Sequence, residues 1–83
     1  MEKSIYTRQY GVFLTLLREA REDAGLTQQD LAAKLDTTQS QVSKCERGER
    51  RLDVIELREW CAALGVKTPK FVAKLDETLS HPK

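Results

Sequence analysis

Two short amphipathic segments, separated by only three residues, constrain the fold of this chain more than any other feature. The first segment runs from Gln28 to Leu35 and the second from Gln39 to about Arg47. Thr27 and Thr38 precede them, and a hydroxyl residue at that place caps the free N–H groups of a helix. We therefore predict two short helices that a tight turn holds against each other.

Helical signals also account for the rest of the chain, whereas the alternation expected of strands is almost absent. A first helix is predicted from about Gln9 to Ala24, where apolar residues recur at helical spacing. A fourth follows Asp53 and ends at Leu64, and a fifth begins at Thr68-Pro69, with Thr68 as its cap. The predicted fold is all-α, with five helices in one domain over residues 9–79, an N-terminal arm at 1–8 and a flexible tail at 80–83.

Composition excludes several classes of protein. A chain of 83 residues has room for one core. No apolar run approaches a membrane span of roughly 18 residues, and the N-terminus lacks a signal pattern, so we expect a cytoplasmic protein with no membrane partner. Cys45 and Cys61 fall at apolar helical positions and are expected to be buried, reduced thiols. Since His81 is the single histidine, no metal site or cofactor is predicted, and no arrangement of residues suggests an enzyme.

The third predicted helix carries an unusually polar surface. Val42 and Cys45 are its apolar residues, three positions apart, and they would anchor it on the core. Their phase directs four polar residues outward together, namely Gln39, Ser40, Ser43 and Lys44. Amides, hydroxyls and an ammonium group match the donors and acceptors of a DNA major groove, although a polar face that merely contacts water is the simpler alternative.

Residues 26–51, LTQQDLAAKLDTTQSQVSKCERGERR, resemble the phage-repressor (Cro/XRE) helix-turn-helix family. The resemblance extends over about residues 9–66 and implies a five-helix, lambda-repressor-like domain whose partner is double-stranded DNA. Asp36 stands where the family's turn usually carries glycine. Aspartate adopts a left-handed conformation more easily than most residues, but at some cost, so we expect the turn and the orientation of the third helix to differ slightly from the family's. Trp60 stands where a smaller aliphatic residue is usual, and it would either fill the core or contact another chain.

The resemblance also implies roles for individual residues. The four outward residues of the third helix map onto base-reading positions, and phosphate contacts are implied for Gln28, Arg47, Arg50 and Arg51. Arg21 and Glu46 map onto an ion pair between the first and third helices. The alternatives are a solubilising basic loop and two ordinary surface charges. Residues 37–51 hold four basic and two acidic residues, so their net charge of +2 exceeds that of the whole chain, which is +1.

The implied function is transcriptional regulation, with repression by a homodimer on a palindromic operator as the first expectation. Six apolar residues of the last two helices are candidates for the dimer contact, namely Ile55, Trp60, Phe71, Val72, Leu75 and Leu79. The alternative is that they complete the core of the monomer. Other roles considered are an antitoxin that binds a toxin as well as DNA, a controller protein of a restriction–modification system, and a helical protein-interaction module that does not bind DNA.

Overall fold

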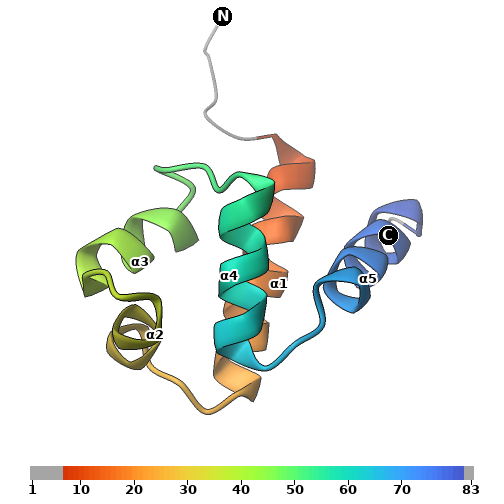
Figure 1. Cartoon of the computed structure of the whole chain (residues 1–83). Helices are drawn as coiled ribbons and strands as arrows, with labels where there is room; N and C mark the ends of the chain where they lie inside the picture. Colours follow the sequence, from red (N-terminus) through yellow and green to blue (C-terminus); the bar gives the residue numbers. More distant parts are fainter. Residues whose placement is uncertain (1–6, 82–83) are drawn as a thin grey trace, which may run out of the picture.

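The computed structural model describes residues 7–81, which fold into five helices and contain no strand. The helices are α1 (Arg8–Asp23), α2 (Gln28–Leu35), α3 (Gln39–Glu46), α4 (Val54–Leu64) and α5 (Thr68–Ser80). In Figure 1, α2 and α3 lie on one side of α4, and α5 lies on the other. Helix α2 packs against α3 and α4, α5 packs against α1 and α4, and α1 also contacts α3. The all-α, five-helix prediction is confirmed.

The core draws at least one apolar side chain from every helix. Leu17, Leu31, Val42 and Cys61 are the largest side chains that are completely enclosed, and they come from four different helices. Both cysteines are buried and unoxidised, as predicted. Because α3 contributes Val42 and Cys45 alone to this core, its position depends on few apolar contacts and needs polar ones in addition.

Trp60 and Phe71 are wrong as candidates for a dimer contact, because the monomer already buries them. Each side chain keeps only 4% of its exposure. The edge of one ring faces the other where Phe71 meets Phe13, with 5.9 Å between the ring centroids. A large aromatic ring stabilises the fold most when its apolar surface is fully removed from water. These two residues therefore complete the core of the small domain.

Side-chain caps fix the starts of four helices. Thr7, Thr27, Thr38 and Asp53 each accept a hydrogen bond from the backbone N–H three residues later. Capping boxes are complete at Thr27 and Asp53, because the carboxylates of Asp30 and Glu56 accept a hydrogen bond from the backbone N–H of the cap residue. At Thr38 only the forward bond, to the N–H of Gln41, is formed.

The ends of the domain differ slightly from the prediction. Helix α5 starts one residue earlier than expected, with Lys67 as a cap that makes no side-chain bond, so Thr68 is the first helical residue. Arg8 and Ser80 are helical, although they were assigned to the arm and the tail. The remainder of the predicted arm, 1–6, and the last two residues of the tail, 82–83, lie outside the described residues.

The turn between α2 and α3 has the predicted length, and Asp36 adopts a left-handed conformation in it. Asp36 has φ 58° and ψ 47°, and it is the one non-glycine residue with positive φ in the range 7–81. This left-handed residue ends α2, and the N–H of Thr37 then donates to the carbonyl of Ala32 at 2.9 Å. The small, buried Ala32 side chain lets the backbone turn back closely, so α3 leaves the turn at a defined angle.

Candidate nucleic-acid interface

The structure brings the four predicted base-reading residues to one edge of α3. Val42 and Cys45 are buried with 1% and 4% of their surface exposed, so the helix cannot rotate without exposing them. This phase leaves the four predicted side chains accessible: Gln39, Ser40 and Lys44 are exposed and Ser43 is half-buried. Gln41 is exposed as well, and it lines the cavity toward α4. Helix α3 therefore presents an edge of hydrogen-bonding groups on a surface that its apolar side fixes in orientation.

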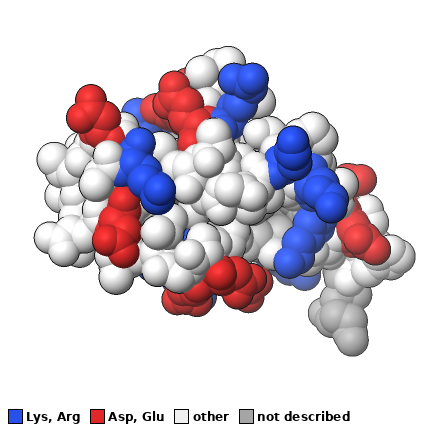
Figure 2. Space-filling model, turned by 60° about the horizontal axis from the view of Figure 1, so that its bottom comes forward, with Lys and Arg blue, Asp and Glu red and all other residues white. Residues whose placement is uncertain are grey.

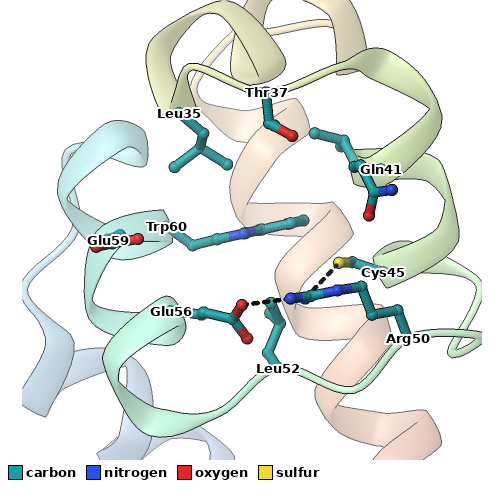
Figure 3. A pocket seen from close by; sticks show the side chains of 10 residues that line it. Leu35, Thr37, Gln41, Cys45, Arg50, Leu52, Glu56, Glu59 and Trp60 are labelled. Atoms are coloured by element: carbon teal, nitrogen blue, oxygen red, sulfur yellow. Dashed lines mark hydrogen bonds and ion pairs between the residues drawn. The ribbon is translucent and has the colours of Figure 1, made fainter.

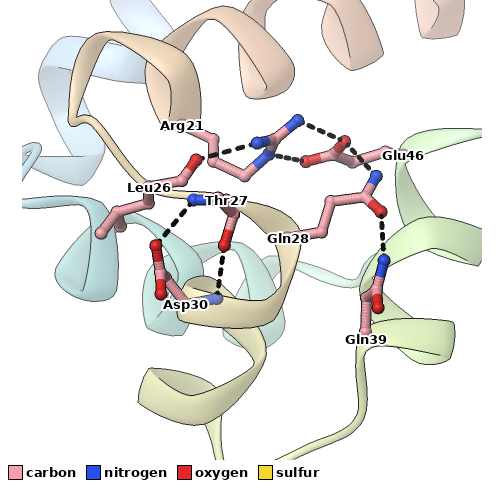
Figure 4. A network of polar contacts seen from close by, with 7 residues as sticks. All are labelled: Arg21, Leu26, Thr27, Gln28, Asp30, Gln39 and Glu46. Carbon is pink, nitrogen blue, oxygen red and sulfur yellow. Dashed lines mark hydrogen bonds and ion pairs between the residues drawn. The ribbon is translucent and has the colours of Figure 1, made fainter.

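A chain of hydrogen bonds joins α1, α2 and both ends of α3 (Figure 4). Arg21 and Glu46 form the ion pair that the family resemblance implies, with Nε donating to Oε2 at 2.7 Å and Nη2 to Oε1 at 3.2 Å. Nη1 of Arg21 also donates to the carbonyl of Leu26 at 2.8 Å. The two charged side chains retain 10% and 5% of their exposure, so they are mostly shielded from water.

Gln28 links this ion pair to the exposed edge of α3. Its Nε2 donates to Oε1 of Glu46 at 3.0 Å, and its Oε1 accepts from Nε2 of Gln39 at 3.4 Å. Gln39 keeps its carbonyl oxygen and one N–H, the two groups needed to pair with an adenine edge. The sequence shows only that glutamines occupy the first positions of α2 and α3, and the bonds that join them were not predicted.

The predicted phosphate-binding arginines all have partners within the chain. Arg47 donates through Nε and Nη2 to both carboxylate oxygens of Glu49, at 2.9 and 3.1 Å, and through Nη1 to Oγ of Ser43. The guanidinium of Arg51 lies 4.3 Å from the centroid of the Tyr10 ring. The hydroxyl of Tyr10 in turn accepts from the N–H of Leu52 at 3.1 Å, which ties the loop after α3 to α1.

Arg50 points into a cavity between α3 and α4 (Figure 3). Its Nη2 donates to Oε2 of Glu56 at 2.6 Å, and Nη1 lies 3.8 Å from Sγ of Cys45. The cavity has a volume of about 240 Å³, and Gln41 and Trp60 also line it. Burial raises the pKa of the Cys45 thiol, and the guanidinium opposes that rise. A phosphate contact by Arg50 stays a prediction and would require its guanidinium to leave Glu56.

Charges of opposite sign lie beside one another on the surface. Figure 2 shows basic and acidic side chains next to one another at several places, with a group of basic side chains at the right and uncharged surface between. Among the cations near the exposed edge of α3, Lys44 forms no ion pair with any residue in the range 7–81. The local excess of positive charge that the sequence indicates is therefore partly neutralised by acidic neighbours.

An apolar groove lies between the starts of α1 and α4 and the length of α5. Leu75 and Leu79, two of the predicted dimer residues, line it while half-buried, together with Tyr10, Leu57 and Val54. Its volume is about 490 Å³. The predicted Ile55 and Val72 are exposed at 62% and 42%, and Val54, which the sequence reasoning did not include, is exposed at 69%. The start of a capped helix is rarely so apolar, and this is the signal that could have identified Val54.

Two chemical features are not found in the part of the chain that the structure describes. No helix there is long and apolar enough to cross a membrane. Within residues 7–81, no three side chains of the His, Cys, Asp or Glu types are grouped so that they could hold a metal ion.

Comparison with known proteins agrees with this geometry. The helix-turn-helix family matches residues 17–71. An uncharacterized HTH-type transcriptional regulator of Sinorhizobium fredii is 41% identical over 58 residues, which are 70% of this chain and 75% of that protein. The structure of an XRE-family like protein from Pseudomonas syringae pv. tomato has 48% identity and a TM-score of 0.79, over 83% of this chain and 84% of that one. The wild-type restriction-modification controller protein C.Esp1396I shares the fold, with a TM-score of 0.81 at 24% identity over 92% and 100% of the two chains.

Proposed function

Because the chain belongs to the helix-turn-helix family, as a DNA-binding transcriptional regulator of the XRE type, we propose that it is a repressor that binds a palindromic operator as a homodimer. The observation that carries this proposal is the exposed edge of α3. Its polar side chains are fixed in phase by two buried anchors, and its first residue, Gln39, is held by Gln28. The proposed role is one of binding, not of catalysis.

In the proposed complex, α3 lies in the major groove and reads bases with Gln39, Ser40, Ser43 and Lys44. The amide of Gln39 suits adenine, and the ammonium of Lys44 suits the O6 and N7 acceptors of guanine. Gln28 has one amide N–H outside its two side-chain bonds, and with the N-terminus of α2 it would hold a phosphate. Because Gln28 is hydrogen-bonded to Gln39, the proposed contact of Gln28 with a DNA phosphate and the proposed contact of Gln39 with a base would position each other.

The test begins with selection of bound duplexes from random DNA, followed by affinity measurements with the wild type and two matched variants. Gln39→Ala should weaken binding to the selected site by roughly 5- to 150-fold, which corresponds to about 1–3 kcal/mol, and should weaken binding to random DNA much less. Gln41→Ala removes the same side chain from the same helix, but Gln41 lines the cavity toward α4, so its effect should be small. Equal losses on both duplexes for Gln39→Ala would contradict base reading.

A homodimer is proposed because one such domain offers a small interface, and two half-sites about one helical turn apart multiply the contacts. The groove that Leu75 and Leu79 line, with the exposed Val54 at its rim, is the surface that we assign to the partner copy.

Sedimentation equilibrium tests the dimer. We expect the wild type to associate in the micromolar range and Val54→Asp to stay monomeric, because a charge would be buried in the groove. Aspartate in the first turn of α4 favours the helix, so this variant should fold. Gln29→Asp, which places the same charge in the first turn of α2, is the matched control. A wild type that is monomeric at high micromolar concentration would rule out the dimer.

A reporter gene tests the direction of regulation. With the selected site placed across a promoter, expression of the protein should lower reporter output, since an occupied site excludes polymerase. A rise in output would instead support the controller alternative, and recovery of DNA binding only in the presence or absence of a second protein would support the antitoxin alternative.

A further inference from the structure

Glu49 lies beside the exposed edge of α3 because the backbone places it there. Gly48 has φ 80°, and the chain reverses at this residue. The N–H of Gly48 donates to the carbonyl of Cys45 at 3.1 Å, and the N–H of Glu49 donates to the carbonyl of Lys44 at 2.9 Å. These two bonds close the helix in a Schellman arrangement. The position of Glu49 is therefore set by the end of α3, independently of its side-chain partner.

The Glu49 carboxylate binds Arg47 as a phosphate would. Nε and Nη2 of the guanidinium donate to its two oxygens in parallel, at 2.9 and 3.1 Å. Guanidinium groups pair with carboxylates and phosphates through this same two-pronged geometry. Nη1 donates to Oγ of Ser43, so three of the five N–H groups of Arg47 are engaged within the protein.

Both charges of this pair are accessible from the DNA side of the proposed complex. The side chain of Arg47 is 54% exposed and that of Glu49 is 50% exposed. Arg47, and to a smaller extent Lys44, lower the pKa of Glu49, so its carboxylate is ionised at neutral pH. An approaching DNA phosphate therefore meets the Glu49 carboxylate, which is already paired with the guanidinium of Arg47.

We propose that Glu49 is an intramolecular competitor of the DNA backbone, which holds Arg47 until a phosphate displaces it and so lowers the affinity for any duplex. This inference rests on the proposed function, in which the edge of α3 faces DNA. It changes the role of Arg47 from a standing phosphate contact to a cation that the protein itself neutralises. The size of the effect is limited, because an exposed ion pair is weak and salt screens it further.

The charge-removing variant Glu49→Gln tests the proposal. Glutamine keeps the size of the side chain and one acceptor oxygen. Affinity for the selected duplex and for a random duplex should rise together, about three- to tenfold at low salt, with the gain shrinking as salt increases. The slope of log K against log salt should steepen by about 0.9, the value for one further neutralised phosphate. Glu77→Gln, which removes the same charge from α5, is the matched control and should leave the slope unchanged.

A double-mutant cycle with Arg47→Ala separates this mechanism from a general change in charge. Arg47→Ala alone should lower affinity for both duplexes by a few-fold, because it leaves the Glu49 carboxylate without its cation. In the Glu49→Gln background the same substitution should abolish the whole gain in affinity. An unchanged or weaker affinity for Glu49→Gln, or a gain in affinity from Glu49→Gln that is as large without Arg47 as with it, would each overturn the proposal.

The wild-type measurements distinguish a failure of this inference from a failure of the proposed function. If the wild type binds its selected duplex with the expected preference while Glu49→Gln behaves as wild type, only the competitor role is wrong. If the wild type shows no preference for any duplex, the proposed function and this inference both fail. Circular dichroism of each variant should match the wild type, because both exchanged side chains are on the surface.

Discussion

Removal of the Glu46 side chain should destabilise the domain severely. The Glu46 carboxylate accepts two hydrogen bonds from Arg21 and one from Gln28, and it is 5% exposed. In Glu46→Ala, the guanidinium of Arg21 stays in a site where it is 10% exposed, with the carbonyl of Leu26 as its remaining partner in Figure 4. A buried charge without its counter-ion is among the costliest defects of a folded protein.

The expected loss is about 3–5 kcal/mol, the usual cost of breaking one partner of a buried ion pair. A chain of 83 residues has a total stability of roughly 4–12 kcal/mol. The variant should therefore lose a quarter or more of its stability, and its Tm should fall by more than about 12 °C. Urea unfolding followed by circular dichroism measures the free energy, and thermal unfolding measures the Tm.

Two further variants identify the cause. Glu49→Ala removes the same type of side chain three residues away, but from an exposed pair, and it should unfold close to the wild type. The double variant Arg21→Leu with Glu46→Leu removes both charges and should recover most of the loss, because no unpaired ion is left. If Glu46→Ala were no less stable than Glu49→Ala, the Arg21–Glu46 pair would not hold α1 against α3, and the reasoning would be refuted.

Two other predictions concern local structure. Asp36→Gly should raise the free energy of unfolding by about 0.5–1 kcal/mol, because glycine adopts φ 58° without the cost that a β-carbon imposes, and a lower urea midpoint would contradict this. Arg50, and then the backbone N–H of Asp53, lower the pKa of Glu56, so its contribution to stability is present above about pH 5 and is lost as pH falls through the lowered folded pKa. Glu56→Gln should therefore be less stable than the wild type at pH 7 and equal to it near pH 2, and a difference in urea midpoint that does not shrink in acid would exclude this account.

The helices and the turn follow from relations between residues close in sequence. A threonine or aspartate and the N–H three residues later form a cap wherever the chain is helical, so Thr27, Thr38 and Asp53 mark the helix starts correctly. Thr68 misleads by one residue, because it is itself the first helical residue and Lys67 takes the cap position without a side-chain bond.

Burial was harder to predict for the last two helices. Ile55, Trp60 and Val72 are all apolar residues near the edge of a helical stripe, yet Trp60 is buried whereas the other two are exposed. Their difference depends on the crossing of α4 with α2 and of α5 with α1, which the spacing within one helix does not contain. The sequence left open whether these apolar residues lie in the core or in a dimer contact. For Trp60 and Phe71, the packing of the monomer places them in the core.

By itself, the sequence determined where α3 begins, which of its sides is apolar, and that the chain carries a helix-turn-helix, since periodicity and caps act over three or four residues. Only the tertiary structure decided the state of the cations around that motif. Arg50 reaches Glu56 across a loop, and Arg51 rests on Tyr10 in another helix. A count of charges treats all of these arginines as free, but folding gives each a partner, because a guanidinium pairs with whatever anion or ring the chain brings within a few ångströms.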